Sequence, residues 1–345
     1  MRLACGCFIV PKDVLDRFAK DKKLSEATRK SFADTSGYEA VWRKLRAAHN
    51  VATKAGIATM GLSKAMAPAP KVTVYDCANT TSLPGAPVAN PGSSADPTAK
   101  RTFDVTTEVA KFYKAAFGRN SIDNAGMTLL SNIHYSTLYN NAFWDGSQMT
   151  YGDGDGQIFI DFTQSNDVVA HELTHGVTQY TAGFNYTNEA GGLNEGMSDA
   201  FGSMFRQWQA DQDAGAADWL IGGGIMGPDA LARGFTCLRD MAKPGDAHCL
   251  APQPFHYRDY RPGMDPHESS GIPNFAFYTA AMTLGGKSWE KLGKVWYAAL
   301  TGLPSPNMRF ATFARRTRRA ARRLYGSEPA VYAAVNAGWN AVGIP

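Results

Sequence analysis

One short stretch of the sequence carries side chains whose types and spacing suit metal binding and the activation of water. It reads His171-Glu-Leu-Thr-His175. Residues four apart on an α-helix lie on one face, so both imidazoles can reach a single cation while Glu172 lies beside it. Two imidazoles favour zinc, and a catalytic zinc takes a third protein ligand and keeps one position for water. The pattern therefore predicts a zinc site at His171 and His175, with Glu172 as the base.

A second motif supplies the remaining ligand. Asn194-Glu-Gly-Met-Ser-Asp199 places Glu195 and Asp199 one turn apart on a second helical stretch, which could pack antiparallel to the first. Glu195 is the predicted third ligand, and Asp199 could accept the free N–H of a ligating histidine and so fix its tautomer. The competing interpretation is a pair of hydrogen-bonded helix histidines. It is weak, because a chain of this composition contains the first motif by chance only about 0.004 times.

The apolar pattern indicates the elements that must position these motifs. Asn166 and Asp167 suit the cap of the helix that carries the first motif. Residues 1–60 form a small helical unit that ends in a linker of small residues, 61–165 contain the expected strands, and 166–345 are mainly helical. The expected strands lie at 72–75, 133–135 and 157–162, and the main expected helices at 104–117, 166–180, 194–209, 273–284, 288–300, 308–324 and 328–340.

Composition restricts the class of protein. The chain has 345 residues and a net charge of +4, which is too small to indicate a nucleic-acid partner. No apolar run reaches the ~18 residues of a membrane helix, and the apolar stretch Leu3–Val10 is too short for a Sec signal. We therefore expect a monomer that is cytoplasmic or secreted by a signal-independent route. Of the five cysteines, Cys237 and Cys249 could form a disulfide or remain free buried thiols.

Several motifs, taken in order, resemble the thermolysin family of neutral metallopeptidases. They are Asn140-Asn-Ala-Phe-Trp-Asp-Gly146, Gly152-Asp-Gly-Asp-Gly156, Val168-Val-Ala-His-Glu-Leu-Thr-His175, Tyr180-Thr-Ala-Gly183 and Asn194-Glu-x-x-Ser-Asp199. The resemblance runs from about Thr73 to Gly343. The N-terminal piece, with Phe8-Ile-Val-Pro11, is similar to the short propeptide of the protealysin-like branch.

The resemblance implies an α+β fold with a β-rich N-terminal lobe, a helical C-terminal lobe and the active-site helix between them, preceded by a small helical propeptide. It implies a zinc-dependent endopeptidase that is made as a proenzyme, acts on peptides or proteins and is inhibited by its own propeptide. Glu172 would take a proton from the attacking water and pass it to the leaving amine. Tyr186 and His267 match the family's donors to the tetrahedral oxyanion.

The resemblance also implies a substrate-binding set. Asn141 and the Ala142 carbonyl match the positions that pair with substrate backbone, and Arg239 matches the arginine that braces the carbonyl on the leaving side. The pocket for the residue after the scissile bond would be lined by Phe159, Phe162, Val168, Ile221, Ile225 and Leu238. Any one of these apolar residues is more often plain core. Together, at the family's pocket positions, they predict cleavage on the N-terminal side of bulky hydrophobic residues.

The sequence departs from the family at two places. Arg206 stands where secreted members have an acidic ligand for paired calcium ions, and Leu220 and Gly223 stand where further carboxylates would be expected. We therefore expect the double calcium site to be absent. Pro262 occupies the place of the acidic residue that orients the active-site histidine, a role for which Asp265 could substitute.

Two other functions fit parts of the pattern. The chain could be a zinc hydrolase that acts on a bond other than a peptide, but the substrate-backbone set argues against this. It could instead be a latent or non-catalytic zinc protein whose cleft is blocked by its N-terminal piece, although such a protein would have no use for Glu172. Within that piece, Cys5 or Cys7 could bind the zinc, or Phe8-Ile-Val10 could merely pack on the lobe.

Overall fold

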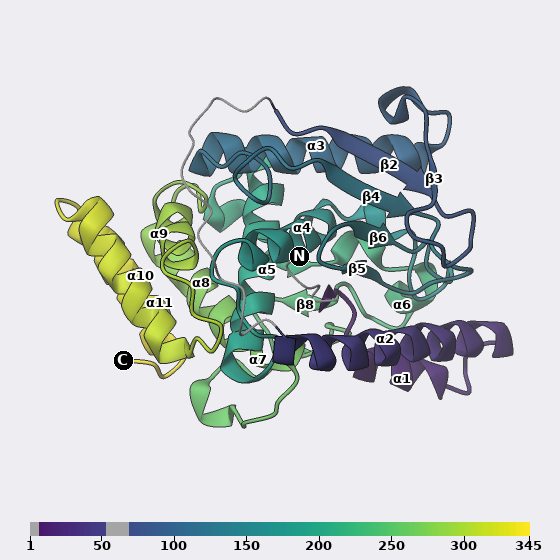
Figure 1. Ribbon diagram of the computed structural model, residues 1–345. Helices are drawn as coiled ribbons and strands as arrows, with labels where there is room; N and C mark the ends of the chain where they lie inside the picture. The colour runs from purple at the N-terminus through teal and green to yellow at the C-terminus, as the bar shows by residue number, and fades with distance from the viewer. Residues whose placement is uncertain (1–6, 53–68) are drawn as a thin grey trace.

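The computed structural model describes residues 7–52 and 69–345 (Figure 1). The linker expected between Lys54 and Lys71, and the domain boundary at residues 60–61, lie outside the described residues apart from 69–71. We call residues 7–52 the N-terminal segment. The rest of the chain forms a lobe that contains a sheet and a lobe that consists mainly of helices (Figure 1).

The sheet has six strands in the order β1-β5-β6-β4-β2-β3. Strand β4 pairs in parallel with β2 and with β6, and the other pairs are antiparallel. Helix α3 (Pro97–Phe117) packs against β2 and β4 and begins at Asp96, whose carboxylate accepts the N–H of Thr98. The strands are β1 Cys7–Phe8, β2 Val72–Asp76, β3 Ala86–Pro87, β4 Leu129–Ile133, β5 Ala142–Trp144 and β6 Met149–Tyr151.

The helical lobe is built around α4 (Asn166–Gln179) and α5 (Asn188–Gln209), which pack against each other and are buried over most of their lengths. Their close approach requires Gly202, since a Cβ there would lie 2.7 Å from the backbone oxygen of Asp167. The remaining elements are β7 Leu220–Ile221, α6 Pro228–Ala232, β8 Arg239–Asp240, α7 Pro266–Ser269, α8 Gly271–Leu284, α9 Lys291–Leu300, α10 Phe310–Tyr325 and α11 Pro329–Ala341, together with 3₁₀ turns at Pro91–Ser93, Phe162–Gln164, Ala214–Ala216, Gly223–Ile225 and Tyr257–Asp259.

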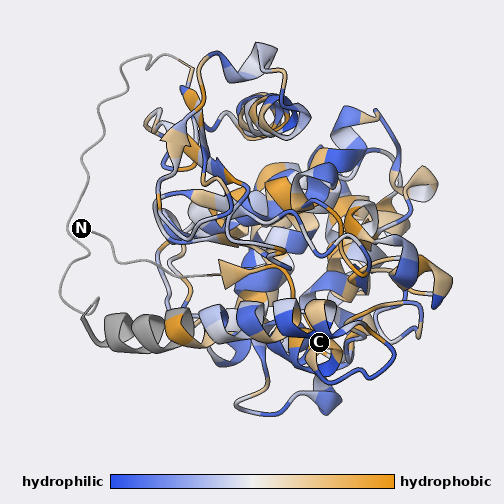
Figure 2. Ribbon diagram, turned by 90° about the vertical axis from the view of Figure 1, so that its right-hand side faces the viewer, coloured by the Kyte–Doolittle hydropathy of each residue, from blue (hydrophilic) through white to orange (hydrophobic). Residues whose placement is uncertain are grey.

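The apolar core runs through both lobes. It includes buried residues of the N-terminal segment, of the sheet and of every long helix of the C-terminal lobe. In Figure 2 the hydrophobic residues gather in the middle of the molecule, while the outer helices carry many hydrophilic residues. Within residues 7–52 and 69–345, no helix is long and apolar enough to cross a membrane.

The N-terminal segment is not purely helical. It begins with strand β1, which extends the sheet at β5, and continues as α1 (Lys12–Ala19) and α2 (Glu26–Ala52) (Figure 1). Ser25 caps α2, because its hydroxyl accepts the N–H of Thr28. The N-terminal segment therefore joins the lobe that contains the sheet through backbone pairing as well as through packing.

The strand expected at 157–162 is wrong. Phe159 forms only an isolated bridge with Met226, and Phe162 begins a 3₁₀ turn. The carboxylate of Asp155 accepts the backbone N–H groups of Gln157, Ile158 and Phe159, so a side chain satisfies the donors that a strand ladder would use. The strand expected at 133–135 is also displaced, because β4 ends at Ile133 and the next residue has a left-handed φ of 51°.

Candidate active site

The three predicted metal ligands meet between α4 and α5. The Nε2 atoms of His171 and His175 lie 3.0 Å apart. The Glu195 carboxylate lies 3.3 Å from His171 Nε2 and 3.5 Å from His175 Nε2. Because α4 presents both imidazoles on one face, the antiparallel helix needs to contribute only one carboxylate to complete the group.

Polar side chains of α5 hold both imidazoles by their other nitrogen. His171 Nδ1 lies 2.8 Å from the Asp199 carboxylate. His175 Nδ1 lies 2.9 Å from Asn194 Oδ1 and 3.1 Å from the Ser198 hydroxyl. With their Nδ1 atoms engaged in this way, the two rings present Nε2 to the shared point.

The residues present fit a zinc ion. Their separations of 3.0–3.5 Å match the roughly 3.3 Å edge of a tetrahedron whose metal–ligand bonds are about 2.0–2.1 Å. All three side chains are buried, and Glu195 Oε2 accepts no hydrogen bond within the described part of the chain. A buried carboxylate oxygen with no donor is costly unless a cation neutralises it. Two imidazoles and one carboxylate are also a donor set typical of catalytic zinc.

Glu172 lies beside this group with one oxygen held and one available. Its Oε2 accepts the backbone N–H of Trp144 on β5 at 3.0 Å, whereas Oε1 has no hydrogen-bond partner among the described residues. Burial raises the pKa of the Glu172 carboxyl well above its usual range. The arrangement leaves one oriented carboxylate oxygen for proton transfer.

Tyr186 and His267 lie on the other side of the group. The Tyr186 hydroxyl donates to Glu195 and lies 3.3 Å from His267 Nε2. Asp265 occupies the orienting position, because its carboxylate lies 2.8 Å from His267 Nδ1 and also accepts the His267 backbone N–H at 3.0 Å. Burial lowers and the Glu195 and Asp265 carboxylates raise the pKa of His267, with a net increase.

The start of the N-terminal segment lies in the cleft as an extended strand. Phe8 pairs with β5, and its backbone carbonyl accepts a hydrogen bond from His267 Nε2. The next residue, Ile9, donates its N–H to the Ala142 carbonyl at 3.2 Å. Phe8 and Ile9 are both buried. The chain thus passes the metal-binding group with a carbonyl directed at His267.

The predicted substrate-binding side chains hold this strand by its backbone. Arg239 Nη1 donates to the Ile9 carbonyl at 3.0 Å. The Asn141 amide forms two bonds with Val10, accepting its N–H at 3.0 Å and donating to its carbonyl at 3.1 Å. Asn141 also donates to Glu39 of α2 at 2.7 Å. Every substrate-backbone group that the sequence analysis named therefore contacts the N-terminal segment.

The six expected pocket residues are all fully buried, and they belong, like Ile9 of the N-terminal segment, to the apolar core that runs through both lobes. Their positions are Phe159, Phe162, Val168, Ile221, Ile225 and Leu238. The Phe159 ring also lies 6.0 Å from the ring of Phe32 in α2, which gives the N-terminal segment a second apolar contact beside the pocket.

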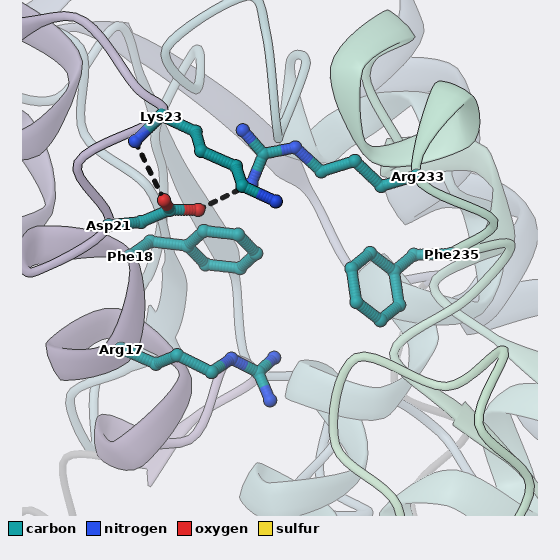
Figure 3. A pocket seen from close by; sticks show the side chains of 6 residues that line it. All are labelled: Arg17, Phe18, Asp21, Lys23, Arg233 and Phe235. Carbon is teal, nitrogen blue, oxygen red and sulfur yellow. Dashed lines mark hydrogen bonds and ion pairs between the residues drawn. The ribbon is translucent and has the colours of Figure 1, made fainter.

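A further contact surface lies outside the cleft, where the N-terminal segment meets the loop after α6 (Figure 3). Arg233 forms an ion pair with Asp21 at 2.5 Å. Arg17 donates to the Leu250 carbonyl at 2.7 Å, and its guanidinium lies 5.9 Å from the centre of the Phe235 ring. These contacts attach α1 to the helical lobe independently of the metal-binding group.

Four contributors were not predicted from the sequence. They are Asn194 and Ser198 on His175, the Trp144 backbone N–H on Glu172, and Asn274, which donates to Asp199 at 2.8 Å. Asn194 and Ser198 could have been identified, because they directly precede Glu195 and Asp199 on the same helix. The other two come from distant elements, and no local pattern marks them.

The structure also describes the positions at which the sequence departs from the family's double calcium site. Arg206 forms an ion pair with Asp218, and the Asp218 carboxylate accepts the N–H of Leu220 at 3.0 Å. Gly223 begins a 3₁₀ turn. Thus the Arg206 guanidinium pairs with the Asp218 carboxylate close to Leu220.

The sequence left two questions open about the cysteines: whether Cys237 and Cys249 form a disulfide, and whether Cys5 or Cys7 binds the zinc. Cys237 and Cys249 are free buried thiols whose sulfurs lie 3.8 Å apart. Cys7 is buried and is not a member of the group formed by His171, His175 and Glu195. Cys5 lies outside the described residues.

Comparisons with known proteins agree with this geometry. Residues 53–179 match the model of the thermolysin metallopeptidase catalytic domain, and residues 182–344 match that of its alpha-helical domain. An extracellular metalloprotease of Pectobacterium carotovorum subsp. carotovorum is 40% identical over 283 residues, which cover 79% of this chain and 80% of that protein. A bacillolysin of Brevibacillus brevis is 38% identical over 79% of this chain but only 51% of its own length.

A solved structure extends the similarity to the N-terminal segment. The precursor of protealysin, a metalloproteinase from Serratia proteamaculans, superposes with a TM-score of 0.83 at 36% identity, over 98% of this chain and 100% of that one. The α+β, two-lobed fold and the proenzyme organisation expected from the sequence are confirmed. The chain belongs to the thermolysin family of zinc metalloendopeptidases and is made as a proenzyme with a short N-terminal propeptide.

Proposed function

We propose that this metalloendopeptidase uses His171, His175 and Glu195 as its zinc ligands and Glu172 as its general base. The support is the buried, tetrahedrally spaced donor set and the available Oε1 atom of Glu172 beside it. Zinc bound there supplies a Lewis acid that polarises the scissile carbonyl and lowers the pKa of the attacking water. Glu172 Oε1 takes the proton of that water and delivers it to the leaving amine.

Negative charge that develops on the oxygen of the scissile carbonyl needs hydrogen-bond donors. Tyr186 and His267 are proposed to supply them, since the Phe8 carbonyl of the N-terminal segment already accepts a bond from His267. Asp265 keeps the His267 ring directed into the cleft. Asp199 acts indirectly, by orienting His171.

Cleavage is proposed on the N-terminal side of bulky hydrophobic residues. The observation that carries this proposal is the placement of Ile9. Its N–H is bound by the Ala142 carbonyl, which was expected to pair with substrate backbone, and its carbonyl by Arg239, which was expected to brace the carbonyl on the leaving side. Its side chain is fully buried, as are those of the six proposed pocket residues, and all seven belong to the apolar core. A charge placed there would be desolvated with Arg239 as its nearest partner.

A peptide-library digest tests the specificity. The processed enzyme should cut before Leu, Ile, Phe, Val and Met, and a zinc chelator should abolish every cut. Cuts that fall mainly before Asp, Glu or Lys would contradict the proposed pocket and leave the assignment as a zinc endopeptidase intact.

The N-terminal segment is proposed to act as an intramolecular inhibitor. Its Ile9 and Val10 use the backbone contacts of Asn141, Ala142 and Arg239 that a substrate would need. The proposed division of the chain is 1–60 for the propeptide, 61–165 for the β-rich lobe and 166–345 for the active-site helix and helical lobe. A monomer is proposed for the processed enzyme, and light scattering checks this.

Action outside the cell is proposed from the name of the Pectobacterium relative, an extracellular metalloprotease. The sequence analysis expected a route that needs no Sec signal. Comparing activity in the culture medium with that in the cells, in strains with and without a functional Sec pathway, tests both parts of this proposal.

A further inference from the structure

A second cluster of metal-binding side chains lies in the helical lobe, away from the catalytic group. It consists of Cys237, His248 and Cys249, whose ligand atoms all lie within 4.8 Å of one another. The two sulfurs are 3.8 Å apart. His248 Nδ1 lies 3.8 Å from Cys237 Sγ, and His248 Nε2 lies 3.9 Å from Cys249 Sγ. In residues 7–52 and 69–345 it is one of two such groups, the other being the proposed catalytic ligands.

The backbone brings these residues together from the two ends of one loop. Cys237 and Cys249 face each other in an isolated parallel bridge. Hydrogen bonds flank that bridge on both sides, from Thr236 N–H to the His248 carbonyl at 3.0 Å and from Leu250 N–H to the Cys237 carbonyl at 2.9 Å. The relative position of the two thiols is therefore set by backbone pairing and does not depend on flexible side chains.

We propose that Cys237, Cys249 and His248 form a second metal site, which binds a thiophilic divalent cation such as Zn²⁺. Two thiolates bound to zinc at about 2.3 Å with tetrahedral angles lie roughly 3.8 Å apart, which is the separation of the two sulfurs here. The two thiolates neutralise the ion's charge, so the ion and its three protein ligands together carry no net charge when the imidazole is neutral.

The orientation of His248 supports a metal site over a disulfide. Its Nε2 lies 3.1 Å from the buried carboxylate of Asp240. A carboxylate on one imidazole nitrogen is the usual partner of a histidine that binds metal through the other. The other nitrogen, Nδ1, is 2.6 Å from the exposed hydroxyl of Thr236, so water or this hydroxyl can complete four ligands. A disulfide between the cysteines would make no use of this arrangement.

Metal binding at this site would be linked to proton release. Zinc binds cysteine as the thiolate, so an ion that enters the site displaces the protons of the thiols. The His248 side chain is 26% exposed, which gives an ion a path from solvent. Because both thiols are buried, ions without thiophilic character should be poor competitors.

The site would stabilise a segment that matters for the active site. Arg239, which binds both Asp199 and the Ile9 carbonyl, lies within the loop that the two cysteines close. The Leu250 carbonyl that accepts Arg17 directly follows Cys249. A metal ion would therefore hold together the strand that carries Arg239 and the surface on which α1 docks.

Metal analysis and cobalt spectroscopy of the full chain test the proposal. The protein is prepared under reducing conditions with Glu172→Gln in every sample, so that the chain stays whole. We expect about two zinc ions per chain, and about one in the Cys237→Ser, Cys249→Ser double variant. The cobalt-loaded parent should show a sulfur-to-cobalt charge-transfer band in the near ultraviolet, because the catalytic group contains no sulfur.

Control variants separate this site from the other thiols and from misfolding. Cys77→Ser removes an equally buried thiol that belongs to neither metal-binding group, and it should leave the band and the second zinc unchanged. His248→Ala keeps both thiols and should weaken metal binding at this site at least tenfold. If the Cys237→Ser, Cys249→Ser double variant fails to fold, His248→Ala takes its place in the comparison. The cobalt band of the parent is then the primary result.

Three results would overturn the proposal. One is a parent chain that binds a single zinc ion and shows no thiolate band. The other is a band that survives Cys237→Ser, Cys249→Ser but disappears in Cys5→Ser, Cys7→Ser, which would place the thiolate at the catalytic zinc. Thiol titration that finds Cys237 and Cys249 bridged and unable to take up metal after reduction would also reject the site in favour of a disulfide.

Discussion

The guanidinium of Arg239 donates a hydrogen bond to the backbone carbonyl of Ile9 at 3.0 Å, across 230 residues of sequence. The same guanidinium binds both oxygens of Asp199, which orients the ligand His171. One side chain therefore connects the propeptide strand to the metal-binding group. In the proposed mechanism the same contact serves the substrate, so inhibition by the propeptide and substrate binding use one set of groups.

Replacing Glu172 with glutamine should remove the base and keep the metal. The amide leaves the His171, His175 and Glu195 side chains unchanged but cannot accept the proton. We expect at least ~10²-fold lower turnover, with zinc content near that of the parent. Metal analysis and peptide hydrolysis check the two parts. Glu290→Gln, at an exposed glutamate, is the matched control. A zinc-loaded Glu172→Gln enzyme with normal turnover would refute the assigned role.

Placing a charge at Ile9 should release the enzyme from inhibition. The Ile9 side chain is fully buried in the apolar cluster, and a carboxylate there would be desolvated at a cost of a few kcal/mol. Residues 1–60 and 61–345 are produced separately and mixed. The parent fragment should inhibit at micromolar concentration, and Ile9→Asp should raise the concentration needed at least about tenfold.

The control for that experiment is Lys22→Asp, which places the same side chain at an exposed position of the N-terminal segment. It should inhibit like the parent fragment. If the parent fragment does not inhibit at micromolar concentration, the inhibitor role is wrong.

Calcium should affect stability little. Arg206 contacts Asp218, and Leu220 and Gly223 offer no carboxylate. Thermal melts of the zinc-bound protein should nearly coincide with added calcium and with a calcium-selective chelator. A decrease of about 10 °C or more on chelation, the scale of a site worth several kcal/mol, would reveal a strong calcium site elsewhere in the chain.

Stability should fall as the pH rises above neutral because of His134. Its Nδ1 lies 2.8 Å from Asp153 and its Nε2 3.1 Å from Asp96, and these carboxylates raise its pKa to about 9 from an ordinary value of 6.5. The folded state therefore holds a proton that the unfolded chain releases first. The stabilisation is complete below pH 6.5 and is lost as the pH passes through about 9.

Denaturant unfolding at several pH values measures this effect. The slope from His134 should be less than the ~1.4 kcal/mol per pH unit of one full proton, because the ring is partly exposed. His134→Asn tolerates the positive φ of this position and should flatten the slope, as should Asp153→Asn. Equal slopes in the parent and both variants would show that the ion pair does not contribute.

The local sequence pattern was sufficient to predict which side chains lie together where a single helix positions them. The period of an α-helix alone puts His171, Glu172 and His175 on a common side, and it does the same for Glu195 and Asp199. The prediction of a strand at 157–162 was wrong. The apolar run correctly indicated burial, but it did not indicate the conformation of the backbone. Its N–H groups bond to Asp155, a competition that hydrophobic periodicity does not register.

By itself the sequence identified the family and predicted the proposed metal ligands and base, because these depend on spacing within single helices and on motifs in order. Only the tertiary structure decided which distant residues meet. It brought Ile9 between Ala142 and Arg239, placed Trp144 on Glu172, and assembled Cys237, His248 and Cys249 beside Asp240. Such contacts depend on how strands pair and on where a loop closes, and those choices come from the burial of the whole core, which no short stretch of sequence records.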